Sequence, residues 1–194
     1  MRPDQLAIRR LQQLFIRAQR SRLREPTAVT LATADAQGRP SARTVLVKGI
    51  DARGVVFYTN LHSRKAQELA ANPRAALCVY WEPLDTQVSI EGHVEPVTHE
   101  EAEAYWKTRP RESQVGAWAS HQSAPLRSQA VLLTRVAKYA AQFMGRPVPR
   151  PAHWSGFRII PDRMEFWTRR AHRLHHREVY RKVGRQWIQR LLYP

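Results

Sequence analysis

Apolar and polar positions alternate with helical spacing near the start of the chain. Within residues 8–20 the apolar side chains recur at i, i+3, i+4 and i+7, at Leu11, Leu14, Phe15 and Ala18. This spacing predicts an amphipathic helix. The other face is basic, with Arg9, Arg10, Arg17 and Arg20. We predict that residues 1–24 form a basic amphipathic helix that lies on the protein body with its charged face in solvent.

The pattern changes to short β-type runs between Pro26 and Pro96. Five runs are separated by turn residues, and they cover 28–33, 41–50, 55–59, 75–81 and 87–97. Short strands with such regular turn signals predict an antiparallel barrel or sandwich. One helix interrupts them at 63–73, where Ser63 is a favourable N-cap and Asn72–Pro73 ends the helix.

Helical patterning returns in 98–145 and is followed by a second group of strands. Thr98 and Glu101 have the spacing of a capping box, and 128–143 predicts a longer helix. Strands are expected at 156–160, 163–167, 178–183 and 186–192. We therefore predict one domain over 1–194, mainly β with flanking helices (α+β), in which the helical segment 98–145 packs on an antiparallel barrel.

The composition is that of a globular protein, with 43% hydrophobic residues. No stretch approaches the roughly 18 consecutive apolar residues that a membrane helix needs. The N-terminal segment also lacks the continuous apolar core of a signal peptide. We expect a cytoplasmic protein that does not bind membranes. The only cysteine, Cys78, lies in an apolar run and is expected to be a buried structural thiol.

A formal charge of +16 indicates an anionic partner. Of the 32 basic residues, 27 are arginine. Such a surface attracts polyanions, which include nucleic acids, acidic membranes and phosphorylated small molecules. The planar fork of arginine favours phosphate and carboxylate groups, but charge alone does not choose among these partners.

Two clusters in the first half of the chain have residue types that bind anions. In the run Arg43 to Lys48, strand alternation places Thr44, Leu46 and Lys48 on one face and Arg43, Val45 and Val47 on the other. A solvated strand end is the alternative explanation for its two cations. Further on, Arg64 and Lys65 occupy the first turn of the helix after Ser63. Cations there are unfavourable to the helix itself, so they indicate an external anion such as phosphate. A basic helix start without a ligand is the alternative explanation.

Two further clusters lie in the second half. Hydrogen-bonding types suited to phosphate gather in 105–123, at Tyr105, Arg109, Arg111, Ser113, Gln122 and Ser123. Between Trp167 and Arg177 stand three histidines and four arginines, without cysteine or carboxylate. A metal site is disfavoured in this segment because it offers histidine without the cysteine or carboxylate ligands that usually accompany it. A grip on single-stranded nucleic acid and a site for a small phosphorylated aromatic molecule both stay open at this point.

Taken in order, the clusters resemble the pyridoxine/pyridoxamine 5'-phosphate oxidase family. The similarity runs from about Glu25 to Pro194. It rests on many motifs at the family's spacing, namely EPTAV, RTVLVK, VFYTN with SRKA, NPRAAL, QVSIEG, RPRESQVGAWAS with QS, W-x-GFR, EFW and HRLHHR. One such motif is weak evidence, but this many in order is a specific signal.

The resemblance implies an FMN-binding split β-barrel and a homodimer with the flavin at the subunit interface. It implies FMN contacts at Arg43, Thr44, Val45, Leu46, Val47, Lys48, Tyr58, Thr59, Arg64, Lys65, Gln87, Gln122, Ser123, Trp167 and Arg177. It implies substrate contacts at Lys48, Tyr105, Arg109, Ser113, Arg173 and His175, of which Arg173 and His175 are the expected catalytic residues. No metal is implied.

The implied reaction oxidises pyridoxamine or pyridoxine 5'-phosphate to pyridoxal 5'-phosphate. A hydride passes from the substrate's C4' carbon to the flavin, and O2 then reoxidises the flavin and is released as H2O2. The protein's task is to place the substrate ring over the cofactor. Two other functions stay open, which are a flavin-binding protein on the same barrel without this activity and a basic nucleic-acid-binding module.

The sequence departs from the family pattern in three places. His176 replaces an acidic residue between His175 and Arg177, and Thr168–Arg170 replace residues that are commonly glycine. The N-terminal arm is short and does not match the arm that covers the substrate in some members. If the segment around 173–176 is extended, Arg173 and His175 point to one side and His176 to the other.

Overall fold

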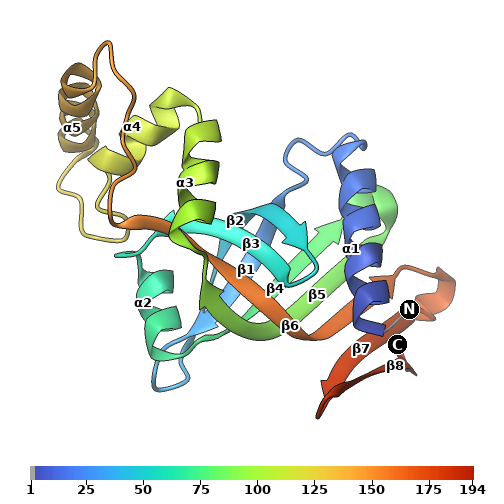
Figure 1. Ribbon diagram of the computed structural model, residues 1–194. Coiled ribbons are helices and arrows are strands. Elements are labelled where there is room, and N and C mark those ends of the chain that lie inside the picture. Colours follow the sequence, from blue (N-terminus) through green and yellow to red (C-terminus); the bar gives the residue numbers. More distant parts are fainter. Residues whose placement is uncertain (1–2) are drawn as a thin grey trace.

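Six antiparallel strands close into a barrel in the computed structural model, which describes residues 3–194 (Figure 1). Around the barrel their order is β3-β2-β1-β4-β5-β6, and β6 pairs back with β3. The bounds are Ala28–Ala34 for β1, Pro40–Asp51 for β2, Gly54–Asn60 for β3, Arg74–Trp81 for β4, Thr86–Pro96 for β5 and Trp154–Thr168 for β6. The prediction of an antiparallel barrel with flanking helices is confirmed.

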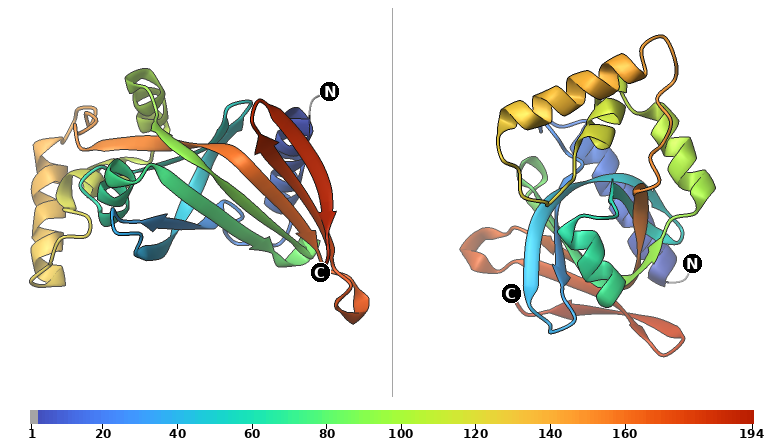
Figure 2. Two further views of the ribbon diagram at one scale, coloured as in Figure 1. Left: turned by 90° about the horizontal axis from the view of Figure 1, so that it is seen from below. Right: turned by 90° about the vertical axis from the view of Figure 1, so that its left-hand side faces the viewer.

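Strand β6 both closes the barrel and extends beyond it. Its first half pairs with β3, where Gly156 lies opposite Tyr58. Its second half pairs with β7 (His176–Val183), which continues into β8 (Gln186–Leu192). Figure 2 shows this hairpin at one end of the molecule and helix α5 (Gln129–Gln142) at the other.

The prediction of separate strands at 156–160 and 163–167 is wrong, because β6 runs through both. Pro161 pairs with Gly92 and Arg163 pairs with Glu91, so Asp162 is an extra residue on β6. This bulge accommodates a proline, which has no N–H for the sheet. The approach is close: a Cβ at Gly92 would lie 2.0 Å from the Ile160 carbonyl oxygen, so only glycine fits there.

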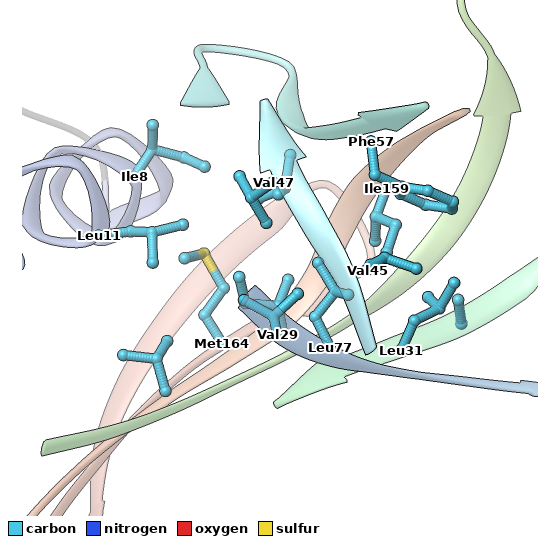
Figure 3. Close-up of a cluster of buried hydrophobic side chains, with 14 of the residues drawn as sticks. Ile8, Leu11, Val29, Leu31, Val45, Val47, Phe57, Leu77, Ile159 and Met164 are labelled. Atoms are coloured by element: carbon cyan, nitrogen blue, oxygen red, sulfur yellow. The ribbon is translucent and has the colours of Figure 1, made fainter. Parts of the chain in front are cut away.

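Alternating apolar residues of the strands fill the barrel, among them Val45, Phe57, Leu77, Ile159 and Met164 (Figure 3). Helix α1 (Pro3–Gln19) packs its apolar face, including Ile8 and Leu11, against this core. Helix α1 lies within the range 1–24 in which an amphipathic helix was predicted, and it ends at Gln19. Burial of such side chains stabilises the fold by about 1.5–3 kcal/mol each.

Four α-helices follow α1 within residues 3–194. They are α2 (Arg64–Ala71), α3 (His99–Thr108), α4 (Arg111–Ala119) and α5. The capping box of Thr98 and Glu101 is present at α3. Through Ala102, α3 packs with Val56 of the barrel, whereas α5 buries none of its residues and contacts α4. Within the segment 98–145, α3 therefore contacts the barrel, whereas α5 lies against α4.

Two smaller expectations need correction. Ser63 precedes α2, but its side chain does not cap the helix. Cys78 is half-buried rather than buried, because it alternates with the buried Leu77 and lies on the outer side of β4 near Ser89. Among residues 3–194, no helix combines the length and apolarity needed to cross a membrane.

Candidate functional site

A cavity of about 410 Å³ opens between β2, β3 and the helices α2 to α4. We call it the β2–β3 pocket. The structure gathers twelve of the predicted site residues around it, namely Arg43, Thr44, Val45, Leu46, Lys48, Tyr58, Thr59, Lys65, Tyr105, Arg109, Ser113 and Gln122, together with Pro110. Its volume is in the usual range for a small-molecule site.

Strand alternation decides which side chains of β2 are available to a ligand. Val45 and Val47 are buried, whereas Thr44, Leu46 and Lys48 are exposed on the outer side of the barrel. The alternation predicted from the sequence is confirmed. Val47 does not border the β2–β3 pocket, because its side chain belongs to the core.

Lys65 is a buried ammonium group at one end of the pocket. Its Nζ lies 3.0 Å from Gln122 Oε1 and 3.3 Å from both Thr59 Oγ1 and Ser63 Oγ. Burial lowers the pKa of Lys65, and the charge of Arg43 lowers it further. Within the described residues, no carboxylate comes within ion-pair distance of this nitrogen. The arrangement therefore favours an anionic ligand beside Lys65.

Glu68, which the sequence analysis did not single out, joins the arginines of the two anion-binding clusters. Its carboxylate accepts from Arg43 Nη2 at 3.1 Å and from Arg64 Nε at 2.8 Å. Burial raises the pKa of Glu68, but hydrogen bonds from neighbouring hydroxyls and both arginines outweigh this and lower it to about 2. The i, i+4 spacing from Arg64 was the only sequence signal for this contact.

Arg64 itself is oriented differently from Lys65. Its side chain is 64% exposed and does not border the pocket. Its backbone N–H donates to Ser123 Oγ at 3.2 Å, so the loop after α4 reaches the start of α2. Ser123 has a left-handed backbone (φ 72°). Of the two predicted cations in this turn, only Lys65 points into the pocket.

Stacked aromatic rings form another wall. The Tyr58 ring stacks on Tyr105 at 4.1 Å and on Trp154 at 5.3 Å between centroids. The Arg109 guanidinium lies 4.6 Å from the Trp154 ring centre, and its Nη2 donates to the Ser113 carbonyl. Burial raises the pKa of both tyrosines and lowers that of Arg109, so the hydroxyls stay protonated donors at neutral pH. Trp154 was not among the predicted site residues.

The other predicted residues meet at the far end of the sheet. Gln87 on β5, Trp167 on β6 and Arg177 on β7 are direct neighbours across the strands. Arg177 Nε donates to Glu165 at 2.8 Å. The His175 ring lies 4.5 Å from the Trp167 ring.

Arg173 and His175 border a second cavity of about 560 Å³, which we call the 169–175 pocket. Asp85 contributes its only carboxylate, and the other lining residues are Arg169, Arg170, Ala171 and His172. The expectation of an extended segment is wrong at Arg173, because 171–173 form a turn with left-handed backbone at His172 and Arg173. Across the described residues, His, Cys, Asp and Glu form no group of three that suits a metal ion.

The two pockets lie far apart within a single chain. They share no lining residue. Trp167 lies eleven residues beyond Gly156, the partner of Tyr58, which corresponds to roughly 35 Å along a strand. The predicted site residues therefore form two half-sites on opposite parts of the barrel.

Comparison with known protein families gives two matches. The model described as "Pyridoxamine 5'-phosphate oxidase" matches residues 15–143. The model described as "Pyridoxine 5'-phosphate oxidase C-terminal dimerisation region" matches residues 154–194. The first match contains the β2–β3 pocket, and the second contains Trp167, Arg173, His175 and Arg177.

Individual relatives agree with these matches. The chain is 60% identical to a pyridoxine/pyridoxamine 5'-phosphate oxidase of Alkalilimnicola ehrlichii, over 87% of this chain and 86% of the relative. It is 54% identical to one from Myxococcus xanthus, over 96% and 91%. Among solved structures, PhzG from Burkholderia lata 383 in complex with tetrahydrophenazine-1-carboxylic acid superposes with a TM-score of 0.92 at 36% identity, over 96% and 92%.

Proposed function

The chain belongs to the pyridoxine/pyridoxamine 5'-phosphate oxidase family, and from this premise we propose that it is an FMN-dependent oxidase. It converts pyridoxamine or pyridoxine 5'-phosphate to pyridoxal 5'-phosphate, with O2 as the electron acceptor and H2O2 as the second product. The observation that carries the proposal is that two separate cationic groups, one with Lys65 and one with Lys48, border one pocket. We assign one group to each of two phosphorylated molecules.

The first cationic group fits the phosphate of FMN. Lys65 is buried and has no carboxylate partner within residues 3–194, and Gln122 and Thr59 stand within hydrogen-bond distance of it. Arg43 borders the same end, and Arg64 adds charge at the start of α2. The outer side of β2, with Thr44 and Leu46, is open to the rest of the cofactor. When bound, FMN would accept two electrons and a proton from the substrate and pass the electrons to O2.

The second group fits the substrate's phosphate. Lys48 lies five residues after Arg43 on β2, which places the two backbones roughly 16 Å apart. Beside Lys48 in the same pocket stand Tyr105, Arg109 and Ser113. Their hydroxyl and guanidinium groups are donors suited to phosphate oxygens. Holding the phosphate at this end would orient the substrate ring along β2.

The predicted site residues in 167–177 can reach the β2–β3 pocket only from a second subunit under this proposal. Arg173 and His175 lie too far from Lys48 on their own chain to share a small substrate. They lie in the region that matches the dimerisation model. We therefore propose a homodimer in which Trp167, Arg173, His175 and Arg177 of one protomer complete the pocket of its partner. Since β6 pairs with β3 and β5, we further propose that 1–194 fold as one domain.

An interface site makes assembly depend on the cofactor. FMN that contacts both protomers should stabilise the dimer by mass action. We expect light scattering of serially diluted protein to show dimers persisting to lower concentration with FMN than without it. A monomer that binds FMN fully and tightly would contradict the interface site, even if the oxidase activity were present.

The reaction itself is tested without oxygen. Adding pyridoxamine 5'-phosphate to the FMN-loaded protein under anaerobic conditions should bleach the flavin absorption band, because electrons pass to the flavin and cannot leave it. Admitting O2 should restore the band and produce H2O2. Pyridoxamine without phosphate is the control, and it should react much more slowly because Lys48, Tyr105, Arg109 and Ser113 lose their partner.

The same experiment separates the alternative functions. A yellow protein that no phosphorylated vitamer bleaches would be a flavin-binding protein without this activity. A colourless protein with salt-sensitive affinity for polyanions would support the nucleic-acid-binding module. Bleaching by a reduced phenazine carboxylate, but not by pyridoxamine phosphate, would assign a substrate like the ligand bound to the PhzG relative.

A further inference from the structure

Glu68 is the most extensively bonded carboxylate next to the β2–β3 pocket. Its side chain is only 6% exposed. It accepts hydrogen bonds from four side chains on three elements: Thr33 of β1 at 2.5 Å, Ser41 of β2 at 2.7 Å, Arg43 of β2 and Arg64 of α2. Glu68 does not border the pocket itself, so it acts on any ligand only through these neighbours.

The same hydroxyl groups also bind Arg43. Arg43 Nη1 donates to Thr33 Oγ1 and to the Leu31 carbonyl, and its Nη2 donates to Ser41 Oγ as well as to Glu68. Both terminal nitrogens are therefore fixed by the protein. Because Glu68 is the only carboxylate in this group, it supplies the counter-charge that lets Arg43 stay half-buried beside the pocket.

Arg64 depends on Glu68 in a different way. Only its Nε bonds to the carboxylate, and among the described contacts its terminal nitrogens donate to no other protein group. Such a contact restricts a long, exposed side chain, which loses conformational entropy when it is ordered. It leaves two nitrogens available for an anion near the start of α2.

We propose that Glu68 is a positioning residue for the phosphate of the flavin cofactor: it holds Arg43 and Arg64 in place so that they and Lys65 form a preorganised phosphate site. The inference rests on the proposed FMN function. It also sets the local charge, since three cations and one carboxylate give a net +2. A phosphate monoester carries about −1.5 to −2 at neutral pH, so the two charges nearly balance.

Charge repulsion and positioning predict opposite changes in FMN affinity when Glu68 is removed, so one measurement distinguishes them. A carboxylate near a phosphate repels it, so removing Glu68 would strengthen FMN binding if charge were the whole effect. If positioning dominates, removing Glu68 frees both arginines and FMN binding weakens. The two explanations therefore differ in the sign of the change.

The experiment compares FMN with riboflavin, which lacks the phosphate. Dissociation constants of both flavins are measured by fluorescence quenching for the full-length wild type, Glu68→Ala and Glu68→Gln. We expect Glu68→Ala to raise the Kd for FMN about tenfold or more, with little change for riboflavin. Glu68→Gln keeps one acceptor oxygen and the side-chain volume, so it should retain part of the preference and also serve if the alanine variant does not fold.

Glu178→Ala is the matched control. Glu178 is similarly buried and accepts from Tyr180 at 2.9 Å, and from Arg10 and Gln189, but it does not contact Arg43, Arg64 or Lys65. We expect it to lower the melting temperature and to leave the ratio of the two flavin affinities unchanged. A fall of that ratio in the Glu68 variants alone is the signature of positioning rather than of general destabilisation.

The outcomes separate this inference from the proposed function. If wild-type protein binds FMN no more tightly than riboflavin, the FMN phosphate site and the role of Glu68 both fail. If wild type prefers FMN and the Glu68 variants keep or increase that preference, the function stands and the positioning role is overturned. If both flavins weaken equally, Glu68 is only structural, which also overturns the proposal.

Discussion

Arg173→Ala is expected to lower kcat/KM for pyridoxamine 5'-phosphate about 10- to 100-fold, the range of one charge-assisted hydrogen bond, while FMN stays bound. Arg173 borders the 169–175 pocket and not the half-site with Lys65. In the proposed dimer it acts on the partner's substrate and not on the FMN phosphate. Steady-state kinetics and the flavin content of the purified variant measure the two effects separately.

Arg181→Ala provides the control for lost charge. Arg181 is exposed on β7 and does not border either pocket, so its removal should leave kcat and KM within error of wild type. The opposing hypothesis is that the residues around Arg173 form only a solvated basic rim. In that case Arg173→Ala would match Arg181→Ala in both constants, and a flavin-binding protein without this activity would become the better description.

Replacing Arg64 and Lys65 together with alanine should weaken FMN binding about 100-fold or more, since each charge-assisted phosphate contact is worth roughly 1.5–3 kcal/mol. Most of the loss should come from Lys65, because it is buried in the pocket whereas Arg64 is 64% exposed. Fluorescence titration with FMN measures the affinity, and thermal unfolding of the apoprotein measures stability. The affinity should fall by more than the stability does.

A charge-matched control replaces Arg53 and Lys107. Both are exposed, and neither borders the β2–β3 pocket; Arg53 pairs with Glu101 as Arg64 pairs with Glu68. This double variant has the same net charge as the test variant, so any general electrostatic effect on FMN binding would be equal in the two. Unchanged FMN affinity in the Arg64 and Lys65 double variant would remove the phosphate assignment.

Local hydrophobic patterns were sufficient to predict most of the helices and strands. The i, i+3, i+7 spacing of Leu11, Leu14 and Ala18 predicts α1, and all three are buried. The alternation in β2 correctly predicts that Val45 and Val47 face away from Thr44, Leu46 and Lys48. Such patterns are reliable because burial of one face is the main energetic demand on a helix or strand. The residues expected around a phosphorylated ligand were likewise visible as motifs, and twelve of them meet at one pocket.

Contacts between distant segments were decided only by the tertiary structure. Glu68 and Trp154 enter the site through partners on other elements, and neither residue type signals such a role on its own. The turn at Arg173 depends on left-handed backbone at two non-glycine residues, which periodicity does not reveal.

The sequence by itself therefore determined most kinds of elements, their faces and the residue types that gather at the candidate site. The tertiary structure decided that β6 is one bulged strand and that the site residues divide between two pockets. The physical reason is that hydrophobic periodicity reports only whether a side chain is inside or outside. The position of Trp167 relative to Tyr58 instead follows from strand register and barrel closure, which link residues far apart in the chain.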